Sequence, residues 1–190
     1  EVRTLTANPG AERSPAISPN GGRLAYLSNL KRGGETDVMV VDIAPNAEFR
    51  GQPRNLTVKW ALDPGAPDWA GSNSSVRFSS VIGGNVHLFE ADGGGVKQIT
   101  KGDRYLRAFT FSKSGGRMAY TIDSAMAPAK VSIASRNGSD ETRVTSFNDE
   151  WLKDITLAAP ERIVYTVSDG TQIEGWVVPP IAQESSKQYP

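Results

Sequence analysis

The chain has 190 residues and no formal net charge, with 21 lysines and arginines against 21 aspartates and glutamates. This balance does not favour nucleic-acid binding, which is typical of a basic surplus, and the absence of cysteine excludes disulfides and thiolate metal sites. No stretch reaches the roughly 20 apolar residues of a membrane span. The 19 glycines and 12 prolines instead favour short strands joined by tight turns.

The first predicted element is a short strand over residues 2–6, which begins without any preceding turn. It reads as the last strand of a repeat unit, so we expect further sequence upstream. The absence of cysteine and of a recognisable signal segment fits a bacterial cytoplasm or periplasm equally well.

A sequence repeat follows. Residues 14–26, SPAISPNGGRLAY, recur as residues 107–120, RAFTFSKSGGRMAY, at a displacement of 94 positions. Half of this displacement predicts a unit of about 47 residues with a degenerate middle copy, which we identify at residues 66–78, APDWAGSNSSVRF.

A second marker has the same period. An aliphatic residue precedes threonine at four regularly spaced places, and these threonines are 51, 43 and 45 positions apart. They are Thr6, Thr57, Thr100 and Thr145. Two independent markers with matching periods make a chance similarity a poor explanation.

Each unit is predicted to contain four short strands. In the first unit they lie at residues 16–17, 23–27, 37–42 and 54–57. The alternating segment 85–90 is the third strand of the second unit, and segments 130–134 and 142–145 are the last two strands of the third unit. Four strands in 40 to 50 residues are typical of a β-propeller blade, and a β-sandwich is the alternative.

The predicted fold is therefore all-β: a partial β-propeller of about three four-stranded blades followed by a β-hairpin. The blades cover residues 7–57, 58–100 and 101–147. Three blades cannot close a ring and would leave strand edges exposed. We expect either a fragment of a longer protein or self-association through the open blade edges.

The C-terminal part has a different pattern. Residues 148–160 read as a linker, and residues 161–190 hold a hairpin whose strands flank Asp169 and Gly170. A two-residue turn there would place Trp176 opposite Ile163.

These segments carry a resemblance to known families. Residues 14–21 resemble the blade signature of TolB-like proteins and of prolyl oligopeptidase-family serine peptidases. Residues 160–176, with Pro160-Glu161 followed by Ser168-Asp169-Gly170, resemble the first hairpin of the peptidase family's α/β-hydrolase domain. The peptidase resemblance, which covers roughly residues 14–190, implies an acylaminoacyl-peptidase or dipeptidyl-peptidase type of enzyme.

The sequence offers little chemistry of its own. The Gly-x-Ser-x-Gly nucleophile elbow is absent, and one histidine without cysteine cannot supply a zinc site. We expect that histidine, His87, to be structural or on the surface, and the acidic pair Asp149-Glu150 to be a solvated linker. We therefore predict no catalytic, cofactor-binding or metal-binding residue.

The four tryptophans divide by position. Trp69 and Trp176 lie in predicted strands, so we expect both to pack in a core, whereas Trp60 and Trp151 lie near loops and could line a surface.

Two functions follow from the resemblances. The first is a non-catalytic fragment of a serine peptidase, whose intact form hydrolyses short peptides while the propeller gates access. The alternative is a TolB-like propeller that binds a protein partner. The two differ in what they expect of the hairpin, because only the second places it in a blade.

Overall fold

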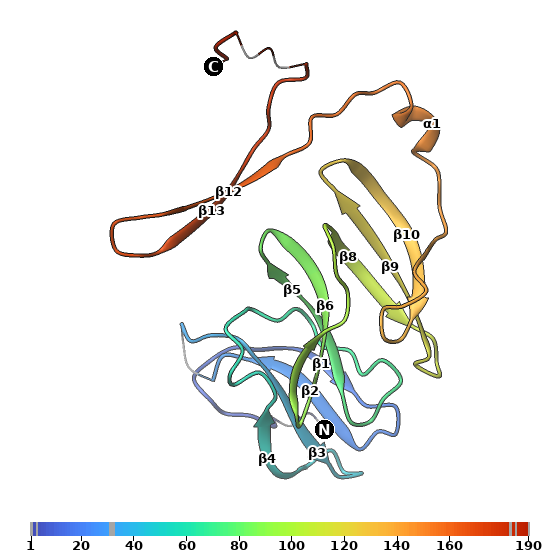
Figure 1. Ribbon diagram of the computed structural model, residues 1–190. Helices are drawn as coiled ribbons and strands as arrows, with labels where there is room; N and C mark the ends of the chain where they lie inside the picture. The colour runs from blue at the N-terminus through green and yellow to red at the C-terminus, as the bar shows by residue number, and fades with distance from the viewer. Residues whose placement is uncertain (1, 3, 31–32, 183, 185, 190) are drawn as a thin grey trace.

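The computed structural model describes every residue except 1, 3, 31, 32, 183, 185 and 190. The first antiparallel sheet has four strands in chain order, which is the order of a propeller blade (Figure 1). These strands are β1 (Glu12–Ile17), β2 (Arg23–Ser28), β3 (Asp37–Ile43) and β4 (Phe49–Asn55).

Two further blades follow and are joined by one parallel bridge between Val86 and Tyr105. The strands of the second are β5 (Val76–Ile82), β6 (Asn85–Asp92) and β7 (Gly95–Gln98). Those of the third are β8 (Tyr105–Phe111), β9 (Arg117–Ser124), β10 (Ala127–Ser135) and β11 (Thr142–Arg143). The prediction of an all-β, blade-like architecture is confirmed.

The second blade is irregular at its inner edge. The inner strand predicted near residues 66–69 is reduced to an isolated bridge between Asp68 and Arg77. Pro67 has no amide hydrogen to donate to a ladder, and Ala70 and Gly71 both have positive φ angles, of 49° and 71°. These angles end the extended conformation immediately after Trp69.

The predicted N-terminal strand is not formed. Residues 2 and 4–6 have no strand pairing, and residue 3 lies outside the described residues. A strand needs a neighbour to accept its backbone hydrogen bonds, and no described strand pairs with this segment.

Two hydrophobic cores lie between consecutive blades. The core between the first two blades centres on Phe78 and Phe89, with Trp60 in edge-to-face contact at 5.2 and 5.0 Å. Trp69, which is buried as predicted, donates from its indole nitrogen to the Ala16 carbonyl at 2.9 Å. Trp60 is only partly buried, so it packs against this core and also lines a hollow at the surface, as its predicted position near a loop allowed.

The repeated threonines have a structural role. Each of Thr57, Thr100 and Thr145 joins the end of its own unit to the third strand of that unit. The hydroxyls of Thr57, Thr100 and Thr145 accept the backbone amides of Val38, Leu88 and Val131 at 3.0, 3.0 and 2.9 Å. The aliphatic residue before each threonine donates its own amide to the carbonyl of the same third-strand residue, at 2.8 to 2.9 Å. The repeated dipeptide therefore fastens the end of each blade.

Replacing Thr57 with valine should destabilise the chain by about 1–3 kcal/mol, because the buried Val38 amide would lose its acceptor. Urea denaturation followed by circular dichroism measures this loss. Thr166→Val is the control, since Thr166 is exposed in the C-terminal hairpin. Equal denaturation midpoints for the two variants would contradict the fastening role.

The C-terminal segment forms a separate sheet. After the short helix α1 (Asp149–Leu152), strands β12 (Glu161–Thr166) and β13 (Gln172–Val177) pair only with each other. No helix in the described part of the chain is long and apolar enough to cross a bilayer. The division into propeller, linker and hydrolase start at residues 147/148 and 160/161 stays a prediction, as does self-association.

The predicted hairpin register is wrong by one residue. Trp176 lies opposite Arg162, and Ile163 lies opposite Gly175. The loop has three residues, because the Val167 amide donates to the Thr171 carbonyl and the Gly170 amide donates back to the Val167 carbonyl, both at 2.9 Å. Gly170 has a φ of 87°, the left-handed conformation that commonly ends a three-residue hairpin loop.

Candidate functional site

A hollow lies between the hairpin and the adjacent ends of the second and third blades. Its volume is about 560 Å³, and it is lined by residues that include Gly84, Arg104, Tyr105, Arg107, Met126 and Trp176. These residues come from turns and strand ends, where propellers place side chains that are free of sheet packing. The hollow therefore combines cationic and aromatic groups at the junction with the hairpin.

The hairpin reaches the blades through Trp176. The turn between β5 and β6 consists of Gly83 and Gly84, with φ angles of 54° and 70°, as a two-residue hairpin turn requires. A Cβ placed on Gly84 would lie 2.2 Å from Cζ2 of Trp176. The indole thus packs directly on the glycine backbone, and Figure 1 shows the hairpin standing apart from the blade sheets above this turn.

Trp176 was predicted to pack in a core, and that prediction is wrong. Its exposed fraction is 47%, compared with 4% for Trp69. The two-stranded hairpin sheet has no second layer of its own among the described residues, and Trp176 packs instead on the glycine turn. Most of the apolar side chains of the hairpin are also exposed, including Ile163, Tyr165 and Val177.

Arg107 is an accessible cation of the hollow, with 58% of its side chain exposed. Its Nε and Nη2 each lie 2.9 Å from Oδ2 of Asp123, and its guanidinium carbon lies 4.6 Å from the centre of the Tyr105 ring. The ion pair and the ring contact fix the guanidinium plane. Nη1 has no hydrogen bond to a described residue, so it can donate to a carbonyl or carboxylate of a ligand.

Arg104 lies deeper and pairs with Glu141, with 2.7 Å between Nη1 and Oε2. The buried Tyr120 hydroxyl approaches Glu141 and Arg104 but makes no hydrogen bond of normal geometry to a described residue. Burial, together with the Glu141 carboxylate, raises the pKa of Tyr120 to about 12. Tyr120 therefore keeps its proton near neutral pH and packs as an uncharged side chain beside the Arg104–Glu141 ion pair.

Stability should fall as the pH rises from about 10 to about 12, because the unfolded chain loses the Tyr120 proton before the folded chain does. Tyr120→Phe should reduce this fall without lowering stability at neutral pH. Urea midpoints measured at pH 7 and at several values above 10 test both expectations. An unchanged pH dependence in the phenylalanine variant would contradict the assignment.

His87 is buried in β6, as expected for a structural histidine. Its Nδ1 lies 3.2 Å from the hydroxyl of Thr100, one of the blade-fastening threonines. Burial, with a smaller contribution from the charge of Arg104, lowers the pKa of His87. It is thus an uncharged part of the blade near neutral pH.

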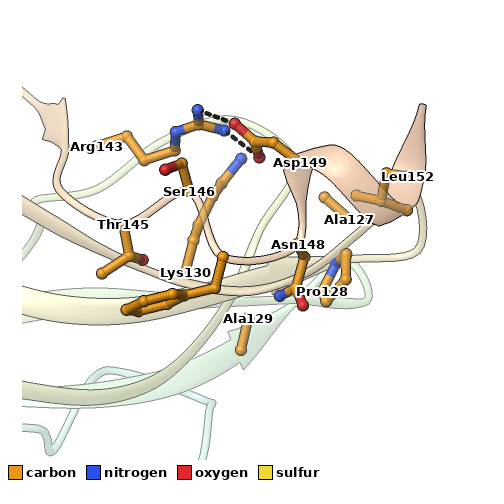
Figure 2. Close-up of a pocket in the computed structure, with 11 residues that line it drawn as sticks. Ala127, Pro128, Ala129, Lys130, Arg143, Thr145, Ser146, Asn148, Asp149 and Leu152 are labelled. Carbon is orange, nitrogen blue, oxygen red and sulfur yellow. Dashed lines mark hydrogen bonds and ion pairs between the residues drawn. The ribbon is translucent and has the colours of Figure 1, made fainter.

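The acidic pair Asp149-Glu150 begins α1 beside a small hollow of about 110 Å³. Figure 2 shows Asp149 in a two-bond ion pair with Arg143 of β11. Glu150 pairs with Lys153, with 2.5 Å between the charged atoms. Each carboxylate therefore has a cation of this chain as partner, and Trp151 beside them is 64% exposed.

No group of three or more histidine, aspartate or glutamate side chains in the described part of the chain is placed to hold a metal ion. The absence of catalytic, cofactor and metal residues from this chain stays a prediction. Sequence reasoning missed Arg104 and Arg107, because each lies far in sequence from the hairpin that forms the other wall of the hollow.

No protein-family model matches the chain. It is 25% identical to dipeptidyl-peptidase 5 of Trichophyton schoenleinii over an alignment of 194 positions, which covers 99% of this chain and 26% of that relative. The chain thus spans about a quarter of the length of the curated relatives that it matches most fully.

Solved structures agree on the fold. An acylaminoacyl peptidase of Pyrococcus horikoshii superposes with a TM-score of 0.69 at 20% identity, over 89% of this chain and 25% of that one. TolB of Acinetobacter baumannii superposes with a TM-score of 0.55 at 18% identity, over 87% of this chain and 40% of that one. At these identities the superpositions establish the fold, a partial β-propeller followed by a hairpin.

Proposed function

We propose that this chain, a homologue of the peptidases of the prolyl oligopeptidase family, supplies propeller blades and the domain-joining hairpin of a serine peptidase. In this proposal the catalytic serine, aspartate and histidine lie outside the 190 residues. The propeller restricts entry to short peptides, which pass between it and the catalytic domain. The chain by itself hydrolyses nothing.

One observation carries the proposal: β12 and β13 form their own sheet and do not extend any blade. A propeller that only binds partners needs no such hairpin, whereas a hairpin held beside the blades suits a second domain. Its exposed apolar residues, such as Val164 and Ile173, offer the surface on which a further layer would pack.

The hollow beside the hairpin supports a role in peptide entry. In this arrangement its cations, and Arg107 in particular, face the space between the blades and the added domain. Nη1 of Arg107 could hold a peptide carbonyl or carboxylate there, while Tyr105 and Trp176 offer apolar contact.

The alternative, a TolB-like propeller that recruits a protein partner, has support from the blade superposition. It gives no account of the separate hairpin sheet. The TolB-like alternative would be favoured if the reading frame encoded no Gly-x-Ser-x-Gly elbow after residue 190.

The test compares the 190-residue chain with the product of the complete reading frame. Peptide p-nitroanilides should be hydrolysed by the complete product and not by the 190-residue chain, and a serine-directed phosphonate should abolish turnover. Turnover by the 190-residue chain that the phosphonate abolishes would overturn the proposal. A complete product without hydrolytic activity, and without an elbow, would favour the TolB-like alternative.

A further inference from the structure

A second hollow lies between the second and third blades, at the opposite end of β6 from the hairpin. Gly84 immediately precedes β6, whereas Glu90 lies near its last residue, Asp92. Glu90, Lys97 and Arg136 are among the residues that line this hollow of about 360 Å³. The hollow is therefore separate from the candidate site at the hairpin.

The charges of this hollow are unbalanced. Arg77, Lys97 and Arg136 supply three cations, and Glu90 is the one carboxylate among its described lining residues. Oε2 of Glu90 accepts from Nε of Arg77 at 2.8 Å and from Nη2 of Arg136 at 3.0 Å. Lys97 is exposed and lies opposite Glu90 in the β6–β7 pairing without forming an ion pair, so the cations that line the hollow outnumber its lining carboxylate by two.

Arg77 is the unusual member, because only 1% of the residue is exposed. Its Nε has a carboxylate acceptor, but its Nη1 meets only the sulfur of Met118 at 4.0 Å, and its guanidinium lies 5.0 Å from the Phe111 ring centre. Nη2 has no hydrogen bond to a described residue. Because Arg77 lines the hollow, its unused Nη2 donor and its charge would stabilise an anion bound there.

Arg136 is held rigidly at the mouth of the hollow by both blades. Its Nη1 donates to the Ala70 carbonyl at 3.0 Å, and its Nη2 donates to the Ser75 hydroxyl at 3.2 Å. A weaker contact of 3.5 Å joins Nη1 to the Gly115 carbonyl. Together with the Glu90 ion pair, these contacts use the Nη1 and Nη2 hydrogens of Arg136, so an anion would be held by its Nε and by the charge of the fixed guanidinium.

One further carboxylate lies nearby and limits the site. Asp140 accepts from the hydroxyls of Ser135 and Ser139, both at 2.7 Å, so these two lining hydroxyls do not donate into the hollow. A ligand must therefore be held by the cations, without help from these serines.

We propose that this interblade hollow binds a small oxyanion, a carboxylate or phosphate group, between Lys97 and Arg136 with Arg77 behind them. Both groups present the compact oxygen acceptors that guanidinium and ammonium groups recognise. Because Arg77 belongs to the second blade and Arg136 to the third, the bound anion would also fasten these two blades together.

Titration calorimetry with sodium phosphate and with sodium acetate tests the proposal, at an ionic strength kept constant with sodium chloride. We expect saturable binding at one site with a dissociation constant in the millimolar range. Tighter phosphate binding would identify a phosphate source, and tighter acetate binding would identify a carboxylate source such as a peptide C-terminus. Either order supports the oxyanion site.

Lys97→Gln should weaken binding about three- to tenfold, because one charge-assisted contact is lost. Lys97 is exposed and has no ion-pair partner among the described residues, so this variant should fold normally, which circular dichroism checks. Arg50→Gln removes the same charge from an exposed position in β4 and should leave the dissociation constant unchanged.

Arg136→Gln should abolish saturable binding, although this variant also loses contacts to the second blade. Two outcomes would overturn the proposal. One is the absence of saturable heat with both anions in the folded chain. The other is equal weakening by Lys97→Gln and Arg50→Gln, which would indicate a general charge effect instead of a site.

Discussion

Replacing Gly84 with alanine should release the hairpin from the second blade. A Cβ there would lie 2.2 Å from the Trp176 ring, so the indole must move away. The φ of 70° adds a left-handed strain of about 1–2 kcal/mol for any residue with a Cβ. In a chain labelled with 5-fluorotryptophan, the fluorine resonance of Trp176 should shift towards its solvent-exposed position.

Gly83→Ala is the matched control for this experiment. Gly83 also has a positive φ, of 54°, but a Cβ there would lie 3.8 Å from the nearest atom, Oε1 of Glu174. It should therefore cost similar strain and leave the Trp176 resonance in place. Adding Trp176→Ala should make the stabilities of the two alanine variants nearly equal, since only the strain remains.

An unmoved Trp176 resonance in Gly84→Ala would contradict the docking described for the hairpin. In the complete product of the reading frame, Gly84→Ala should also raise the KM for peptide substrates if the hairpin positions the catalytic domain against the blades. Gly83→Ala should leave that KM unchanged.

Replacing Glu90 with glutamine should destabilise the chain by about 3–5 kcal/mol, because the fully buried Arg77 would lose its anionic partner. Arg77→Met should cost less, about 1–2 kcal/mol, since Glu90 keeps its ion pair with Arg136 and the methionine fills much of the same space. The main expectation is that Glu90→Gln lowers the free energy of unfolding more than Arg77→Met does.

Urea denaturation at pH 7 measures both free energies of unfolding. The double variant Glu90→Gln, Arg77→Met should be more stable than Glu90→Gln alone, because no buried charge then lacks a partner. A single Glu90→Gln variant as stable as Arg77→Met would show that Arg77 does not depend on this carboxylate.

Much of the fold could be predicted from local patterns. The turn at residues 18–22 and its copy at residues 112–116 recur because the first serine of each makes the same bonds. The Ser18 and Ser112 hydroxyls accept the amides of Arg23 and Arg117 at 2.9 and 3.1 Å. Because these hydrogen bonds join residues only five positions apart, they impose a local sequence pattern, and this pattern allowed the blades to be predicted.

The sequence also predicted a similarity to peptidases, and the 25% identity to a dipeptidyl-peptidase 5 along nearly the whole chain confirms that similarity. The hairpin was predicted from Asp169 and Gly170, but its register was not, because Asp-Gly suits both a two-residue turn and the last two positions of a three-residue loop. Only the pairing of Val167 with Thr171 distinguishes the two.

The sequence by itself determined the repeated blades, their fastening threonines and the change of pattern after the third blade, since all of these depend on local hydrogen bonding and alternation. The tertiary structure alone decided where Trp176 packs, that Arg77 and Arg136 share Glu90, and that Arg107 lies beside the hairpin. These contacts join residues that are between 13 and 92 positions apart, and no local periodicity encodes which blade ends meet.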